Sequence, residues 1–337
     1  MVLDEPTSNL DIHAIQELRT ILKLWKKKGK PILIAEHRLS WMKGIADRVL
    51  YFKDGIIAAD IEAEQFYQWP VEKFHRRGLR CTDTFIPQKI KMYKPGNSYT
   101  FTDFTFSYKR GLQLDIQSFD IPKGAVIAIL GDNGAGKSTL AKCICGLMKH
   151  CKGKISDGEK IYRGRKLRTL VYMVFQDVNH QLFSESVQEE VTLGLKVPED
   201  EREKVAVQVL QRMGLYAFKN NHPMSLSGGQ KQRLAVAEAL ATKKELIIYD
   251  EPTSGLDYGN MQIVADMINE LSQEGKTQLI ITHDPEFVER CCDGFIFLEN
   301  GKIKYEGGWT TKNVEIIRKY FNGSRLEGCV DNQVSSC

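Results

Sequence analysis

Short apolar runs alternate with longer amphipathic stretches through the second half of the chain. Each run of strand length is followed or preceded by a stretch whose apolar residues recur every three or four positions, a spacing typical of helices. The predicted strands are 125–130, 246–249 and 278–282, and the predicted helices are 137 to about 149, about 230–243 and about 259–273. This order predicts an α/β fold whose mostly parallel sheet is buried on both faces.

An internal repeat divides the chain. The octapeptide that starts at Asp4 (DEPTSNLD) recurs at Asp250 (DEPTSGLD), 246 residues later. The same offset relates His37 to His283 and Gly55 to Gly301. Each glycine completes a hairpin-turn dipeptide, Asp-Gly or Asn-Gly, between apolar runs. An offset kept over about fifty residues indicates two copies of one structural unit.

The repeat predicts the domain organisation. Residues 1–75 (the first copy) correspond to the C-terminal part of a unit, and residues 98–321 (the second copy) form a complete one. Residues 76–97 are expected to be a linker and 322–337 a flexible tail. Roughly the first 150 residues of the first copy have no counterpart in this sequence. Either Met1 is an internal start, or the chain is a fragment, or the gene is degraded.

Composition narrows the class of protein. The 337 residues correspond to about two domains at roughly 150 residues each, and 42% hydrophobic with 27% charged residues is ordinary for a soluble globular chain. A net charge of +4 gives no reason to expect direct nucleic-acid binding. No apolar run is long enough to span a membrane, and the first residues carry acid where a signal peptide carries base. Eight scattered cysteines are interpreted as reduced thiols.

A glycine-rich segment predicts a phosphate site. Residues 131–138 (GDNGAGKS) fit the pattern G-x-x-x-x-G-K-[ST] between a buried strand and a helix. Glycines let backbone N–H groups turn toward phosphate oxygens, and the helix start adds the positive end of its dipole. Lys137 would reach the β- and γ-phosphates and Ser138 would bind Mg²⁺, so ATP and Mg²⁺ are the expected cofactors. A glycine turn without a ligand is the structural alternative.

Two further segments carry chemistry. The apolar strand 246–249 ends in Asp250, which could hold Mg²⁺ through water, and Glu251, which could polarise an attacking water. The segment Leu226-Ser227-Gly228-Gly229-Gln230 precedes a predicted helix. It could bind an anion at the helix start, or it could simply cap the helix. Together with the phosphate loop and the later His283, these segments resemble the ATP-binding cassette (ABC) ATPases. The resemblance covers all of the second copy and, partially, the first.

The resemblance implies a P-loop NTPase fold with an antiparallel β subdomain and a helical subdomain, and it assigns roles. Glu251, His283 and Gln176 would be catalytic, and Ser138, Gln176 and Asp250 would hold the metal. Nucleotide contacts would come from the phosphate loop, from the segment 226–230, which matches the family's signature, and from three further residues. These are Tyr108 (which would stack on adenine, or else simply pack in the β subdomain), Gly131, Asp132, Asn133, Gly134, Ala135, Gly136, Lys137, Ser138, Thr139, Ser227, Gly228, Gly229, Gln230 and Asp257.

Residues 179–184 and 187–191 are similar to the ATPases of energy-coupling factor (ECF) transporters, which import vitamins and transition-metal ions. That implies a subunit at the cytoplasmic side of the membrane, with transmembrane partners. In the family, two cassettes pair so that each ATP meets the phosphate loop of one and the signature of the other. The first copy has neither element, so neither site is complete in one chain. Hydrolysis would need another cassette, from a second copy of the chain, a paralogue or the missing N-terminal half of the first cassette. A soluble ABC ATPase acting on ribosomes and a truncated nucleotide-binding remnant are the alternatives.

Overall fold

The second copy is built on a six-stranded sheet with the strand order β10-β11-β12-β7-β13-β14. The computed structural model describes residues 1–8, 10–80, 85–87, 97–108, 113–242, 244–324 and 326. Four neighbouring pairs of strands are parallel, and only β14 runs antiparallel to its neighbour β13. The strands are β7 (Val126–Leu130), β10 (Val171–Val174), β11 (Leu246–Asp250), β12 (Thr277–Ile281), β13 (Gly294–Glu299) and β14 (Lys302–Gly308). This confirms the predicted mostly parallel sheet.

Alternate residues of the central strands enter two separate cores, because successive side chains of a strand point to opposite faces. Ala128, Ile247 and Ile280 pack on one face, under helices that include α8 (Gly228–Ala241), α9 (Tyr258–Gln273), α10 (Pro285–Cys291) and α11 (Thr311–Phe321). On the other face, Ile248 and Leu279 pack with α4 (Lys137–Ile144). The apolar stripe predicted for α9 is confirmed, since Met261, Val264, Met267, Ile268 and Leu271 are all buried.

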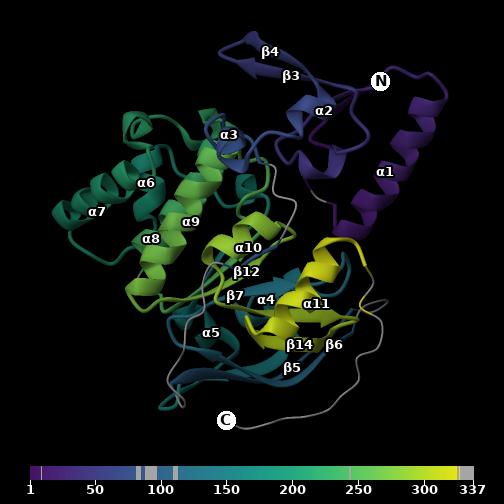
Figure 1. Ribbon diagram of the computed structural model, residues 1–337. Coiled ribbons are helices and arrows are strands. Elements are labelled where there is room, and N and C mark those ends of the chain that lie inside the picture. The colour runs from purple at the N-terminus through teal and green to yellow at the C-terminus, as the bar shows by residue number, and fades with distance from the viewer. Residues whose placement is uncertain are drawn as a thin grey trace.

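Two subdomains flank this sheet (Figure 1). The antiparallel one has the order β6-β5-β8-β9 and comprises β5 (Ser98–Ser107), β6 (Gln113–Pro122), β8 (Lys152–Ser156) and β9 (Ile161–Arg163). The helical one contains α6 (Val187–Thr192) and α7 (Glu199–Arg212), which pack on each other and on α8. The short α5 (Leu167–Leu170) leads into β10. None of the described helices has the length and apolarity that crossing a membrane requires.

One predicted helix end differs from the structure. The helix that begins at Lys137 ends at Ile144 rather than near residue 149. Gly146 adopts φ = 67°, and the N–H groups of Gly146 and Leu147 bond to the carbonyls of Cys143 and Lys142. This is a Schellman motif, which ends a helix at a glycine in the left-handed region.

The first copy repeats the geometry of the C-terminal half of the second. It comprises β1 (Val2–Asp4), α1 (Ile12–Lys27), β2 (Leu33–Ala35), β3 (Arg48–Lys53), β4 (Ile56–Glu62), α2 (Ala63–Phe66) and α3 (Val71–His75). Helices α1 and α9 both have 16 residues and begin at an aspartate cap, Asp11 or Asp257. The β3–β4 hairpin even has its register shift at the position that matches the shift between β13 and β14.

The end of the first copy and the described part of the connector are packed against the second copy. The ring of His75 stacks on that of Tyr258 with centroids 3.7 Å apart. Arg80 is only 3% exposed and forms ion pairs with Asp284 and Glu286. Burial disfavours the charged form of Asp284, but Arg80 and Arg38 hold its pKa below the usual value. Phe85 also packs on the second copy, against Trp309 and Phe321. Most of the tail predicted to be flexible lies outside the described residues.

Arg80→Ala should destabilise the chain by about 3–5 kcal/mol, because two buried carboxylates would lose their cation. Denaturant unfolding followed by circular dichroism measures this difference. Arg48→Ala is the control, since Arg48 pairs with Asp60 at the surface, and this change should have little effect. Equal losses of unfolding free energy in the two variants would show that the buried Arg80 ion pairs contribute no more to stability than a surface pair.

Candidate nucleotide site

The phosphate loop, residues 131–136, connects the buried strand β7 to helix α4. Gly134 and Gly136 have φ values of 82° and 107°, in the region that favours glycine. A Cβ at Gly131 would collide with the carbonyl oxygen of Leu298. Gly136 caps α4 without a side-chain hydrogen bond. The first turn of α4 therefore keeps backbone N–H groups that an anion can take up.

A cavity of about 260 Å³ lies at this loop. It is lined by the loop, by the start of α4, and by residues at the ends of the neighbouring strands. These are Asn133, Gly134, Gly136, Lys137, Ser138, Thr139, Gln176, Asp250, Glu251, Ile281 and His283. Parallel strands present their carboxyl ends at one edge of a sheet, which is where ligands bind in such folds. Residues predicted from separate motifs thus meet around one space.

Lys137 lies at the floor of this cavity and is nearly buried. Its Nζ donates to the carbonyl oxygens of Gly131 and Asp132, at 2.6 and 2.9 Å. Burial lowers its pKa, although Glu251 and Asp11 act in the opposite direction. The ammonium group is therefore held at the loop, where a phosphate oxygen could accept a hydrogen bond from it.

The residues predicted to bind the metal lie together. Ser138 and Gln176 line the cavity beside Asp250, whose carboxylate is hydrogen-bonded to the Ser138 side chain. Burial raises the pKa of Asp250, while that hydrogen bond and two nearby lysines lower it. A hydroxyl, an amide and a carboxylate offer the oxygen ligands that Mg²⁺ prefers, so these residues fit the ion.

Glu251 and His283 face each other across the inner part of the cavity. The distance from His283 Nε2 to Glu251 Oε1 is 3.7 Å. Burial raises the pKa of Glu251 to about 7, against the lowering effects of Arg38 and Lys137. Burial, together with the charge of Lys137, lowers the pKa of His283 to about 3. His283 is therefore neutral at pH 7, and Glu251 is poised to exchange a proton near that pH.

The first copy contacts the phosphate loop, a feature that motif analysis did not identify. Asp11 Oδ2 accepts from the backbone N–H of Asn133 at 2.7 Å, and His13 Nε2 lies 3.6 Å from Asp132. Burial would raise the pKa of Asp11, but hydrogen bonds from the Ala14 and Asn133 N–H groups keep it below the usual value. Asp11 thus places a negative charge beside the loop.

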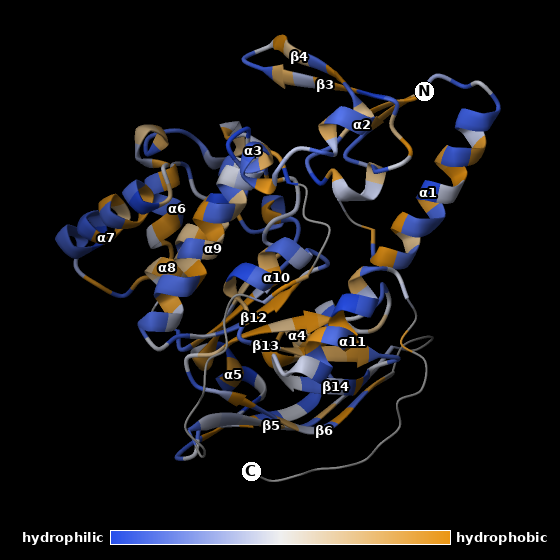
Figure 2. Ribbon diagram, in the orientation of Figure 1, coloured by the Kyte–Doolittle hydropathy of each residue, from blue (hydrophilic) through white to orange (hydrophobic). Residues whose placement is uncertain are grey.

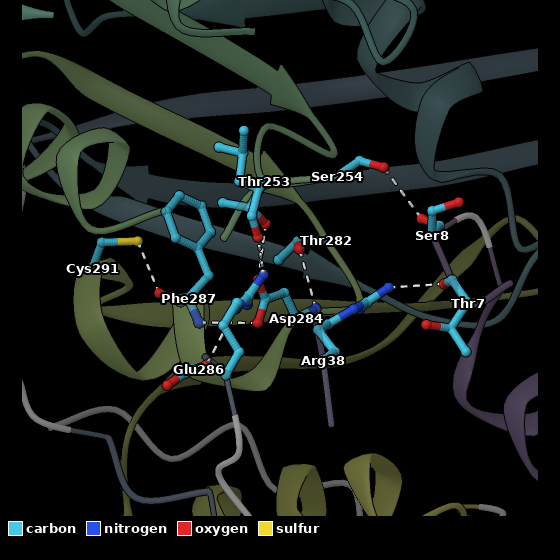
Figure 3. Close-up of polar contacts among 12 residues, drawn as sticks. Thr7, Ser8, Arg38, Thr253, Ser254, Thr282, Asp284, Glu286, Phe287 and Cys291 are labelled. Atoms are coloured by element: carbon cyan, nitrogen blue, oxygen red, sulfur yellow. Dashed lines mark hydrogen bonds and ion pairs between the residues drawn. The ribbon is translucent and has the colours of Figure 1, made fainter. Parts of the chain in front are cut away.

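The repeated octapeptides meet near the middle of the molecule. The Ser254 hydroxyl donates to the carbonyl of Ser8, the residue at the equivalent position of the first copy, at 3.4 Å. Figure 3 shows these serines facing each other, with Arg38 reaching the carbonyl of Thr7. Equivalent residues of the two copies are therefore in contact with each other.

Several predicted residues lie outside the cavity lining, namely Tyr108, Gly131, Asp132, Ala135, Ser227, Gly228, Gly229, Gln230 and Asp257. Tyr108 is exposed, and its ring packs edge-on against Phe106. Ser227 and Gln230 form a capping box at the start of α8. Asp257 caps α9. The first-copy counterpart of Asp257, Asp11, is in contact with the phosphate loop.

Arg80 and Tyr320 are further residues that sequence reasoning missed. Arg80 binds Asp284, the residue after His283, and the Tyr320 hydroxyl lies 3.4 Å from His283 Nδ1. Both are far from His283 in the sequence and belong to no motif. The repeat could have suggested Asp11, because Asp257 had already been assigned a role.

Comparison with known proteins agrees with this geometry. Residues 114–254 match the ABC transporter family model. An ABC transporter ATP-binding protein of Treponema denticola is 41% identical over 314 residues, which are 90% of this chain and 63% of the relative. The structure of cbiO1 from Clostridium perfringens, part of the ABC transporter complex cbiONQ, has 34% identity and a TM-score of 0.56, covering 65% of this chain and 89% of that one.

The chain belongs to the ABC transporter family of ATP-binding proteins. Members of this family hydrolyse ATP. An HMP/thiamine import ATP-binding protein of Bacillus subtilis is 31% identical, over 91% of this chain and 61% of the relative. This ABC protein thus spans a little under two thirds of the length of these curated relatives.

Lys137→Ala should remove most of the affinity of this ABC protein for MgATP, because the buried ammonium is the cation at the floor of the cavity. Isothermal titration calorimetry measures the loss. Lys149→Ala, at an exposed lysine beyond the end of the same helix, is the control and should bind nearly as wild type. Unchanged affinity in Lys137→Ala would rule out this cavity as the nucleotide site.

Asp11→Asn should strengthen ATP binding by about threefold to tenfold, because it removes a negative charge beside the phosphate loop. The amide oxygen can still cap α1. Asp257→Asn is the matched control, since Asp257 caps the equivalent helix away from the cavity, and its ATP affinity should not change. Titration at low salt is most sensitive, and equal effects of the two changes would contradict the assignment.

Glu251→Gln should stabilise the ligand-free chain increasingly as the pH rises from about 4.5 to 7. The unfolded Glu loses its proton near pH 4.5, whereas burial raises the folded pKa to about 7. In this window the folded state binds more protons, so wild-type stability falls as pH rises. Glutamine does not titrate. The difference in melting temperature, variant minus wild type, should therefore increase between pH 5 and 8, and a constant difference would contradict the raised pKa.

Proposed function

We propose that this chain is an ATP-binding and ATP-hydrolysing subunit of an ECF-type importer, which couples hydrolysis to transport through a transmembrane partner. The single observation that supports hydrolysis is the cavity itself. It brings the phosphate loop, three oxygen ligands for Mg²⁺, Glu251 and His283 around one space. Nucleotide binding alone would not need a carboxylate whose pKa lies near 7.

The importer role is supported by the relatives. The cbiO1 protein is part of the complex cbiONQ, and the Bacillus subtilis relative is named for HMP/thiamine import. We propose that this chain likewise lies on the cytoplasmic side of the membrane, bound to transmembrane subunits. Within it, residues 1–75 are the C-terminal part of one cassette, 98–321 are a complete cassette, and 76–97 connect them.

In the proposed mechanism, the N–H groups at the start of α4 and Lys137 bind the β- and γ-phosphates. Mg²⁺, held by Ser138, Gln176 and Asp250, would neutralise charge on the phosphates when bound. Glu251 polarises the attacking water, and neutral His283 donates a hydrogen bond toward the γ-phosphate. Glu251 and His283 are both nearly buried, so their interactions with the substrate are little screened by solvent.

The signature residues Ser227–Gln230 do not line this cavity. In the paired arrangement of the family, the signature that completes the site comes from a different cassette. We therefore propose that hydrolysis at the cavity needs a second complete cassette, from another copy of this chain, from a paralogue or from the missing N-terminal half that would complete the first copy. We propose that Asp11 stays in the assembled site, since its carboxylate accepts a hydrogen bond from the Asn133 N–H group at 2.7 Å.

The dilute chain should accordingly hydrolyse ATP slowly, because the missing signature would supply transition-state contacts that are each worth about 10²–10³ in rate. Phosphate release per chain is measured across a hundredfold dilution, with and without an added complete cassette. The rate should rise with concentration or with the added cassette, and Glu251→Gln should abolish that rise while leaving ATP binding intact. A fast rate that is constant on dilution would show that the single chain suffices.

A transmembrane subunit encoded beside this gene provides the test of transport. Co-reconstituted with that subunit in lipid vesicles, the chain should sediment with the vesicles, and its phosphate release should increase. Co-sedimentation with ribosomes, without any response to the membrane subunit, would instead support the soluble alternative.

A further inference from the structure

The ring of His283 lies between two side chains, one at each of its nitrogen atoms. Nε2 faces the Glu251 carboxyl group at 3.7 Å, and Nδ1 lies 3.4 Å from the hydroxyl oxygen of Tyr320. His283 and Tyr320 are only 6% and 1% exposed. Solvent therefore has little access to Nδ1, and the Tyr320 hydroxyl is its hydrogen-bonding neighbour.

The helix α11 carries this hydroxyl to the site. Ile317 and Tyr320 are three positions apart, so they share one face of the helix, and both are buried in the core that contains Phe297 of β13. The Tyr320 ring packs edge-on against Phe297, with centroids 5.0 Å apart. In Figure 2, α11 lies beside the apolar strands of the central sheet. Packing of the ring thus fixes the place of the hydroxyl.

The hydroxyl of Tyr320 has a proton to donate. Burial raises the pKa of Tyr320 well above its usual value, so the group stays protonated at pH 7. The backbone N–H of Gly131, the first residue of the phosphate loop, hydrogen-bonds to the same oxygen. A backbone N–H can only donate, so this bond uses a lone pair of the oxygen and leaves the O–H free to donate to His283 Nδ1.

A donor at Nδ1 selects one of the two neutral forms of histidine. Neutral imidazole carries one N–H, and its other nitrogen accepts. Because His283 is neutral at pH 7, acceptance at Nδ1 places the ring proton on Nε2. Nε2 is also the nitrogen that faces a carboxyl oxygen, that of Glu251, which can accept from it. The groups on both sides of the ring therefore favour the same tautomer.

We propose that Tyr320 is a positioning residue, which holds His283 in the tautomer that carries its proton on Nε2. This inference rests on the proposed function, in which the Nε2–H group donates toward the γ-phosphate. Without the hydroxyl, the proton can move to Nδ1, and Nε2 then presents a lone pair that repels a phosphate oxygen. Because Gly131 opens the phosphate loop, the same hydroxyl also links that loop to His283.

Nuclear magnetic resonance of the ligand-free full chain, made with isotope-labelled histidine, tests the tautomer. The shifts of the two ring nitrogens report which one carries the proton, and His283→Gln identifies the signals of His283 by their loss. The wild-type chain should carry the proton on Nε2. Tyr320→Phe, which keeps the ring that packs on Phe297, should show a mixture of both tautomers.

Tyr305→Phe is the matched control for this experiment. The Tyr305 ring also packs on Phe297, with centroids 6.2 Å apart, but His283 Nδ1 is hydrogen-bonded to Tyr320. Tyr305→Phe should therefore leave the His283 signals as in wild type.

Kinetics with an added complete cassette test the consequence for hydrolysis. Tyr320→Phe should lower kcat about threefold to tenfold, the change expected from one neutral hydrogen bond, and leave KM for ATP unchanged. Tyr305→Phe should change neither constant. An equal fall of kcat in both variants would overturn the positioning role, since it would show a general effect of packing on Phe297.

Two spectroscopic results would also overturn the proposal. One is a wild-type His283 with its proton on Nδ1, and the other is a Tyr320→Phe chain that keeps the wild-type tautomer. The wild-type spectrum decides even if Tyr320→Phe does not fold. The spectra need neither ATP nor a second cassette, so a chain that hydrolyses nothing would contradict the proposed function and still allow the tautomer to be tested.

Discussion

The nucleotide site depends on keeping the backbone N–H groups of α4 free at the edge of a buried sheet. A helix start that is buried without partners is costly, so it must either be capped by a side chain or take up an anion. Gly136 provides no side-chain cap, and the glycines of the loop hold the backbone in conformations that other residues adopt only with strain. The close approach of Gly131 to the Leu298 carbonyl fixes the start of this loop against β13.

Around that anion site, burial adjusts the acids and bases in opposite directions. It favours the neutral forms, raising the pKa of Glu251 and lowering that of His283. The first copy changes the balance further, because Asp11 adds a negative charge and Arg38 a positive one. Charges of both copies therefore set the pKa values in the site of the complete cassette, although the residues that line its cavity belong to the second copy.

Much of the site could be predicted from the sequence because its chemistry resides in contiguous motifs. The phosphate loop is one segment, and Asp250 and Glu251 follow a strand that apolar periodicity identifies. Contacts such as Asp11 with Asn133, or Arg80 with Asp284, join residues 122 and 204 positions apart and leave no periodic trace. The early end of α4 was missed because it depends on the left-handed φ of Gly146, and many glycines inside helical patterns do not end them.

The packed connector also makes the contact between Asp11 and the phosphate loop independent of protein concentration. His75 stacks on Tyr258, and the Gly78 carbonyl accepts from the Tyr258 N–H at 3.0 Å, so the tether is fastened close to the interface between the copies. A short tether of this kind gives its two ends an effective concentration on the order of millimolar or above. The first copy therefore stays in contact with the phosphate loop at any dilution of the protein. A second cassette that binds at the cavity must therefore do so with the first copy already in contact with the phosphate loop.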